Sequence, residues 1–182
     1  MIFIGHVKTV TCGKSSPEGF YYDSYDYDAF RRLLLEALLC GRPYCRAMHN
    51  VRTDEFIEME FEQAKPDTVL VVDGIFLHRD ELYRHWSFSV FLEADFSTTY
   101  ERMATRDGCP PNPNDEANRR YRDGQLIYLR TCQPQARASL VIENNDPQRP
   151  KNHYWFAATS IFKSRIYWFL AVVMPDCNSI LT

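Results

Sequence analysis

The sequence predicts an α/β fold with three layers, in which helices cover a central, mostly parallel sheet. One observation is the segment 68–73, where four consecutive apolar residues follow a Pro66-Asp67 breaker. An apolar run without alternation is typical of a strand buried on both faces of a parallel sheet. A second observation is that similar runs recur at 88–94 and 138–144, with helical patterns between them. Strands that alternate with helices favour a parallel sheet.

The composition is that of a globular chain and argues against several function classes. With 182 residues, 45% of them hydrophobic, the chain can bury the core of one domain. The net charge of −3 gives no basic surplus for nucleic acid or an anionic membrane surface. The apolar stretch 166–174 is too short to cross a bilayer. We therefore expect neither nucleic acid nor a membrane as a partner.

The cysteine pattern indicates a reducing compartment. The six cysteines are far apart and form no C-x-x-C pair, which favours reduced thiols over a zinc site or a disulfide framework. Residues 1–6 lack the charged region and the sustained apolar core of a signal peptide. The expected location is the cytoplasm.

A strand is expected at residues 2–10, and the segment after it partly matches a phosphate-binding loop. Gly13, Lys14 and Ser15 look like the end of G-x-x-x-x-G-K-[ST], but Lys8 stands where the first glycine is required. The nest of backbone amides that holds phosphates depends on those glycines. An ordinary turn is the alternative for this segment.

An amphipathic helix of about four turns is expected to begin at Asp26, its N-cap, and to end at Gly41. Its entrance, residues 20–28, interleaves aromatic residues such as Tyr22 with aspartates. Aromatic rings beside carboxylates suit a stacked base and a ribose whose hydroxyls donate to an acid. Alternatively, the aromatics belong to the core and the acids favour the helix N-terminus through its dipole.

An exposed antiparallel hairpin is expected over residues 44–63, with its turn near residues 49–54. Apolar and charged residues alternate in this stretch, as in 56–62. His49 and Arg52 are candidates to face a substrate from the turn. The alternative is that His49 is an exposed loop residue without a site role.

Asp73 closes the central apolar run and is followed by Gly74, which allows a sharp turn. Ligands collect at the carboxyl edge of open α/β sheets. A carboxylate at this position can hold Mg²⁺ against the phosphates of a nucleotide. The alternative is an aspartate that caps the next turn.

Arginines cluster around a predicted loop at residues 109–115. A capping-box pair, Thr98 and Glu101, is expected to open the preceding helix, on which Arg102 and Arg106 project from one side. The following helix begins near residue 118 and carries further arginines, including Arg119 and Arg120. Planar guanidinium groups suit clamping a transferring phosphoryl group. A solvated basic face paired with the nearby acids is the alternative.

Several segments together form one joint pattern over roughly residues 13–150. They are 16–27, 69–77, Glu81, Leu82 and Trp86, 102–108, 119–121, Gly124, Gln125 and Tyr128, and 142–146. This pattern resembles the uridine kinase-like P-loop nucleoside kinases. The resemblance implies a P-loop nucleoside kinase fold that is incomplete at the N-terminus, since the family's P-loop and the segment with its catalytic base do not precede Gly13. Residues 151–182 form a divergent C-terminal segment.

The resemblance also implies a function and site residues. The activity would be ATP-dependent phosphorylation of a pyrimidine nucleoside, with ATP and Mg²⁺ bound, in a chain that could also be inactive or truncated. Asp73 would be the acidic residue near magnesium, and Asp26 with Tyr22 would contact the nucleoside. The roles of further residues follow the family pattern: His49 and Arg52 on the pyrimidine side, and Arg102, Arg106, Arg119 and Arg120 in the lid. A non-catalytic nucleoside-binding or interaction module is the alternative, and a homo-oligomer is compatible with either.

Overall fold

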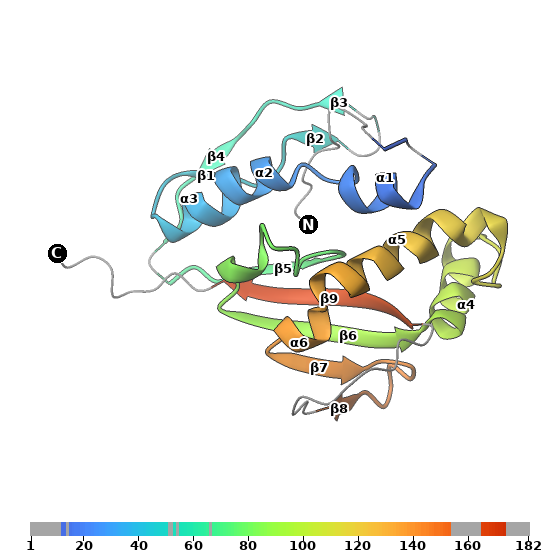
Figure 1. Ribbon diagram of the computed structural model, residues 1–182. Helices are drawn as coiled ribbons and strands as arrows, with labels where there is room; N and C mark the ends of the chain where they lie inside the picture. Colours follow the sequence, from blue (N-terminus) through green and yellow to red (C-terminus); the bar gives the residue numbers. More distant parts are fainter. Residues whose placement is uncertain are drawn as a thin grey trace.

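The computed structural model describes residues 12–13, 15–50, 53, 55–65, 67–153 and 165–173. Its centre is a five-stranded sheet with helices packed on it (Figure 1). The strands lie in the order β5-β9-β6-β7-β8. The expected strand at residues 2–10 lies outside the described residues.

The sheet combines the three strands expected from the sequence with two others. Its strands are β5 (Leu70–Gly74), β6 (Phe88–Asp95), β7 (Leu140–Glu143), β8 (Lys151–His153) and β9 (Arg165–Val173). β5, β6 and β7 run in one direction, but only β6 and β7 pair directly in parallel. The other neighbouring pairs are antiparallel. The mostly parallel pairing expected from the sequence is therefore not shown.

Strand β9 connects the two halves of the sheet. Its backbone pairs with all of β5 on one side and with all of β6 on the other, so that no pairing joins β5 to β6 directly (Figure 1). The C-terminal segment beyond residue 150 thus contributes strands to the same sheet and is not a separate unit within the described residues.

The expectation that the segment 68–73 is buried on both faces is wrong. β5 is an edge strand, and Val69 and Val71 are 52% and 53% exposed, whereas Val72 is buried. Successive side chains of a strand point to opposite faces, so only the face of β5 that carries Val72 meets the core. An unbroken apolar run does not by itself distinguish this arrangement from a central strand.

The first helical region follows the expected boundaries closely. After α1 (Pro17–Tyr22), α2 (Tyr27–Phe30), a π-helical segment (Arg31–Leu35) and α3 (Glu36–Leu39) form one continuous helical stretch. The Asp26 carboxylate accepts a hydrogen bond from the Ala29 amide at 2.9 Å, and Gly41 adopts a positive φ of 63° after the last turn. Both capping predictions are confirmed.

The helices that carry the arginines are α4 (Phe96–Asp107) and α5 (Glu116–Cys132), followed by the short α6 (Pro134–Arg137). The capping-box prediction is wrong, because α4 begins two residues before Thr98, with Asp95 as its N-cap. The predicted loop between these helices is confirmed, and it ends where the Asp115 carboxylate caps the Ala117 amide of α5.

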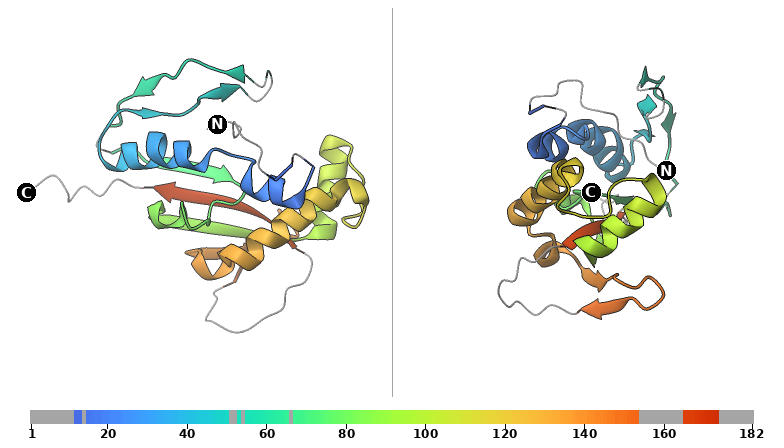
Figure 2. Two further views of the ribbon diagram at one scale, coloured as in Figure 1. Left: turned by 45° about the horizontal axis from the view of Figure 1, so that its top comes forward. Right: turned by 90° about the vertical axis from the view of Figure 1, so that its right-hand side faces the viewer.

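Between β5 and β6 the chain forms a 3₁₀ turn, Tyr83–His85. The expected hairpin is present as an antiparallel ribbon in two parts: β1 (Tyr44–Cys45) pairs with β4 (Phe61–Glu62), and β2 (His49–Asn50) pairs with β3 (Glu55–Phe56). Figure 2 shows this ribbon as the outermost layer, beside α2 and α3.

The core lies between the helices and one face of the sheet. Val72, Phe91 and Val141 provide the sheet side of this core. Tyr21 from α1 and Tyr128 from α5 pack on Phe76, with ring centroids 5.3 and 5.2 Å away. The opposite face of the sheet meets α4 near Leu92 and Ala94, whereas Val71 and Phe88 on that face are exposed. The third layer is therefore only partial among the described residues.

Helices α1 and α5 approach closely because Gly124 has no side chain. A Cβ atom at Gly124 would lie 2.6 Å from Phe20 Cδ1 and 3.0 Å from the Pro17 carbonyl oxygen. We expect Gly124→Ala to destabilise the chain by about 1 to 3 kcal/mol, although alanine is the better helix former. Urea denaturation measures the change. A variant as stable as the parent, or more stable, would contradict the close packing of α1 on α5.

His78 makes stability depend on pH. Its side chain is 1% exposed, bonds Ser89 Oγ through Nε2 at 2.9 Å, and has its pKa lowered to about 3 by burial and by the nearby Arg137 charge. The unfolded chain protonates this imidazole near pH 6.5, whereas the folded chain resists protonation down to about pH 3. His78 therefore contributes stability above pH 6.5 that is lost progressively as the pH falls.

We expect the parent chain to lose about 1 kcal/mol more than a His78→Gln variant for each pH unit below 6. Denaturation curves of both chains at pH 7, 6 and 5 measure this difference, in which the contributions of the other titrating groups cancel. Parallel losses of stability in the two chains would show that His78 is readily protonated in the folded state.

Candidate functional site

The candidate site is a small pocket between the carboxyl end of β6 and helix α4. Its volume is about 100 Å³, and it is lined by Leu92, Ala94, Thr99, Arg102, Met103, Arg106 and Asn144. α4 starts directly after β6, which brings the side chains of its first turns over the strand end. Ligands of α/β proteins bind at this edge of the sheet. Two of the predicted lid arginines, Arg102 and Arg106, meet here.

Arg102 is held rigidly at the pocket. Its Nη1 and Nη2 atoms donate hydrogen bonds to the carbonyl oxygens of Asn144 and Asn145 at 3.0 and 2.7 Å. The Asn145 side chain in turn accepts a bond from the Asp95 amide at 2.8 Å. These contacts fasten the end of β7 to the start of α4. Arg102 therefore has a structural task, and its positive charge is fixed at the strand ends.

Arg106 lies one turn further along α4, and its side chain is much less constrained than that of Arg102. Its Nε and Nη2 atoms donate to both carboxylate oxygens of Asp107 at 2.8 and 2.6 Å, and its side chain is 61% exposed. This pair lowers the pKa of Asp107 and raises that of Arg106. An exposed ion pair of this kind contributes little to stability. An anion in the pocket can thus compete with Asp107 for the guanidinium group.

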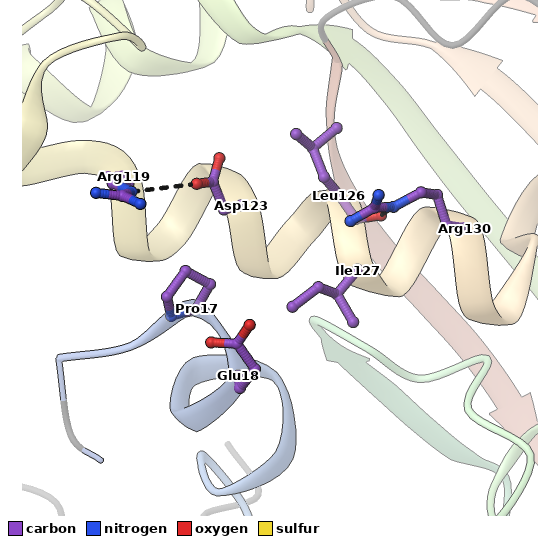
Figure 3. Close-up of a pocket in the computed structure, with 7 residues that line it drawn as sticks. All are labelled: Pro17, Glu18, Arg119, Asp123, Leu126, Ile127 and Arg130. Carbon is purple, nitrogen blue, oxygen red and sulfur yellow. Dashed lines mark hydrogen bonds and ion pairs between the residues drawn. The ribbon is translucent and has the colours of Figure 1, made fainter. Parts of the chain in front are cut away.

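The two arginines expected from α5 lie elsewhere. Arg119 pairs with Glu116 and Asp123 at 3.3 and 3.6 Å and lines a second pocket of about 430 Å³ between α1 and α5 (Figure 3). The Arg120 guanidinium lies 5.3 Å from the ring centre of Phe20. The four predicted lid arginines are therefore not gathered around one ligand. Acidic partners hold Arg119, as the solvated-face alternative expects.

Asp73 is exposed and is not level with the arginine pocket. The side chain of Asp73 lies on the same face of the sheet as that of Ala94. Asp73 is paired with a residue of β9 that is itself paired with Val90 of β6, and Val90 precedes Ala94 by four positions. At about 3.3 Å per residue, this offset is about 13 Å. A single carboxylate suits Mg²⁺ only together with phosphate oxygens of a substrate. The geometry therefore does not support a magnesium site shared by Asp73 and the arginines.

The residues expected to contact a nucleoside serve mainly in local structure. Tyr22 is 47% exposed, and its ring packs on that of Tyr21 at 4.7 Å. Asp26 caps α2, as the alternative interpretation holds. His49 is buried, with its ring 5.6 Å from that of Phe56, so the alternative of an exposed loop histidine is wrong. Arg52 lies outside the described residues.

Sequence reasoning missed Arg79, the most buried arginine of the described chain. Its side chain is 7% exposed, and its guanidinium lies 4.3 and 4.1 Å from the ring centres of Tyr21 and Tyr27. Its Nη1 atom donates to the Tyr21 carbonyl oxygen at 2.7 Å. Nothing in the local pattern distinguishes this arginine from a surface residue. The tyrosines at the entrance of α2 could have indicated a cationic partner.

The partial P-loop match directly precedes a helix cap, and its Lys14 lies outside the described residues. Ser16 Oγ accepts a bond from the Gly19 amide at 2.8 Å and donates to the carbonyl oxygen of Gly13 at 3.0 Å. The Cys12 amide donates to the Asp23 carboxylate at 2.9 Å, and the Ser16 amide donates to the Gly13 carbonyl oxygen at 3.2 Å. Ser16 therefore caps α1, and the amides of Cys12 and Ser16 are already paired, which does not favour a phosphate-binding nest at these two residues.

Comparisons with known proteins identify no relative. No protein-family model, no curated protein and no solved structure matches the chain. Within the part of the chain that the structure describes, no helix is long and apolar enough to cross a membrane. Nor do three or more histidine, cysteine or acidic side chains gather there into a group that could hold a metal ion.

The roles of Asp26 can be separated by two substitutions. Asp26→Ala removes the cap of α2 and should cost about 1 kcal/mol of stability, whereas Asp26→Asn should cost only a few tenths, because asparagine caps almost as well. Thermal denaturation gives both changes. If the aspartate also accepts a ribose hydroxyl, Asp26→Asn lowers uridine affinity while stability stays constant; unchanged affinity in a variant of normal stability removes Asp26 from the site.

Proposed function

We propose that this chain is a uridine kinase-like phosphotransferase that passes a phosphoryl group from ATP to a pyrimidine nucleoside. The observation that carries the proposal is the meeting of Arg102 and Arg106 at the carboxyl ends of β6 and β7. These are the residues that the resemblance assigns to the phosphate lid. The volume of the pocket, about 100 Å³, suits a phosphate-sized group better than a whole nucleoside.

The electrostatics of the pocket support a phosphate ligand. Arg102 contributes a positive charge whose position is fixed by two backbone carbonyls. Arg106 contributes a second guanidinium, which can leave Asp107 and form paired bonds with phosphate oxygens. In phosphoryl transfer, catalysis rests on positioning and on neutralising the charge that is spread over the transferred group. ATP and its Mg²⁺ are part of the proposal through the resemblance.

The second candidate is a non-catalytic nucleoside-binding or interaction module. Two observations favour it: Asp73 is offset from the arginine pocket along the sheet, and Ser16, directly after the partial P-loop match, caps α1. A site without an amide nest for the triphosphate would hold ATP weakly. For either function we propose a cytoplasmic protein, because Cys40, Cys45, Cys109 and Cys132 form no disulfide within the described part of the chain.

The test is the formation of uridine monophosphate from uridine and saturating Mg-ATP by the purified chain. We expect measurable turnover, and Arg106→Ala should lower kcat/KM by about tenfold to a hundredfold, the loss of one charge-assisted hydrogen-bonded contact. Because Arg106 is exposed, its replacement should leave the thermal midpoint nearly unchanged. Arg84→Ala is the matched control, since Arg84 lies on the 3₁₀ turn and does not line the pocket.

Three other results bear on the two candidates. Uridine binding in calorimetry without any product would support the non-catalytic module. Turnover that is equal in the parent, Arg106→Ala and Arg84→Ala chains would contradict the role of the pocket. A chain with neither turnover nor nucleoside affinity would exclude both proposals.

A further inference from the structure

The outer strand of the antiparallel ribbon exposes an unusual number of apolar side chains. We call residues 55–62 the acidic strip. Within it, Phe56, Ile57, Met59 and Phe61 are 55%, 41%, 46% and 52% exposed. They are four of the ten large hydrophobic residues that are exposed in the described chain. Contiguous exposed apolar surface on a single chain marks an interaction site more often than scattered residues do.

The acidic strip runs nearly extended along its partner strand. Its first residue pairs with Asn50 and its last with Tyr44, so eight residues of the strip lie opposite seven. One extra residue is typical of a β-bulge, which leaves the strand otherwise extended. Side chains of an extended chain alternate in direction, but the bulge shifts this alternation once between Ile57 and Phe61, so exposed apolar side chains lie on both faces of the strip.

The strip also carries negative charge. Glu58, Glu60 and Glu62 alternate in sequence with the apolar residues, and Glu55 precedes them. Glu62 is paired with Arg46, whose pKa the charge of Glu60 also helps to raise. Glu55, Glu58 and Glu60 form no ion pair within the described part of the chain. The strip therefore offers exposed apolar side chains together with carboxylates that have no ion-pair partner among the described residues.

We propose that the acidic strip binds an extended basic segment of a partner protein, in which apolar residues alternate with lysine or arginine. The strip is itself nearly extended, which suits an extended segment better than a helix. An added strand would gain main-chain hydrogen bonds at the edge of the ribbon, and its side chains would meet the apolar and the acidic side chains of the strip. Charge complementarity sets the register, because Glu58 and Glu60 need cationic partners.

Two other occupants fit the strip less well. A second copy of this chain would bring an equally acidic strip against the first, and the like charges would repel each other. Nucleic acid would place phosphates against the same carboxylates. The inference goes beyond the proposed phosphotransferase function, because none of the residues of the strip lines the pocket of Arg102 and Arg106.

The probe is a fluorescent peptide of about seven residues that alternates lysine and valine, a usual strand length. We expect the full chain to bind it, as measured by fluorescence anisotropy, and to bind an alternating glutamate–valine peptide at least tenfold more weakly. Replacing the valines by serine should also weaken binding several-fold, because the exposed apolar side chains of the strip then lack apolar contacts.

Charge reversal of the strip provides the decisive comparison. The double variant Glu58→Lys/Glu60→Lys should lose affinity for the lysine–valine peptide at least tenfold and gain affinity for the glutamate–valine peptide. The control, Asp67→Lys/Glu101→Lys, carries the same change of net charge on exposed residues elsewhere and should keep the parent preference.

Three results would overturn the proposal. One is equal binding of the lysine–valine and lysine–serine peptides, which would reduce the interaction to charge alone. Another is an unchanged preference in the strip variant, or the same loss in the control. The third is self-association of the parent chain in sedimentation experiments that Met59→Ser abolishes, because the strip would then be an interface between copies.

Discussion

The contacts of Tyr21 hold the described structure together. Its ring packs on Phe76, which follows β5, and the Arg79 guanidinium lies 4.3 Å from the ring centre. Its hydroxyl lies 3.1 Å from Cys132 Sγ at the end of α5. Burial raises the pKa of this hydroxyl, so it stays neutral. One side chain thus joins α1, the turn after β5 and α5, and a change at Tyr21 would loosen all three.

The contacts of Tyr21 explain why the tyrosine-rich segment 20–28 is a poor candidate for nucleoside binding. Tyr21 and Tyr27 enclose the buried Arg79, and the charge of Arg79 is balanced by ring faces, by the Tyr21 carbonyl and by Glu81. A cation held between aromatic faces is stabilising when it is shielded from water. The exposed charge that can meet a ligand lies elsewhere, at Arg106 beside the ends of β6 and β7.

Local signals in the sequence were sufficient where short-range chemistry decides the structure. The Asp26 cap, the Gly41 stop and the loop before Asp115 depend on neighbouring residues alone, and all three are confirmed. The pattern could not show that β9 lies between β5 and β6, because pairing partners distant in sequence leave no local signal. That pairing separates β5 from β6 and offsets Asp73 from the arginines, and β5 lies at the edge of the described sheet. The spacing of four residues places Arg102 beside Arg106 on α4. It gives no information on Arg119, which lies on a different helix, α5.

The central claim is that the pocket at the carboxyl ends of β6 and β7 receives the phosphate of a nucleotide through Arg102 and Arg106. Nuclear magnetic resonance of the arginine Nε–H groups during titration with uridine monophosphate tests it most directly. The account predicts that the signals of Arg102 and Arg106 move together and saturate, while that of Arg84 stays in place. Saturable binding that shifts other arginines and leaves these two unchanged would contradict it.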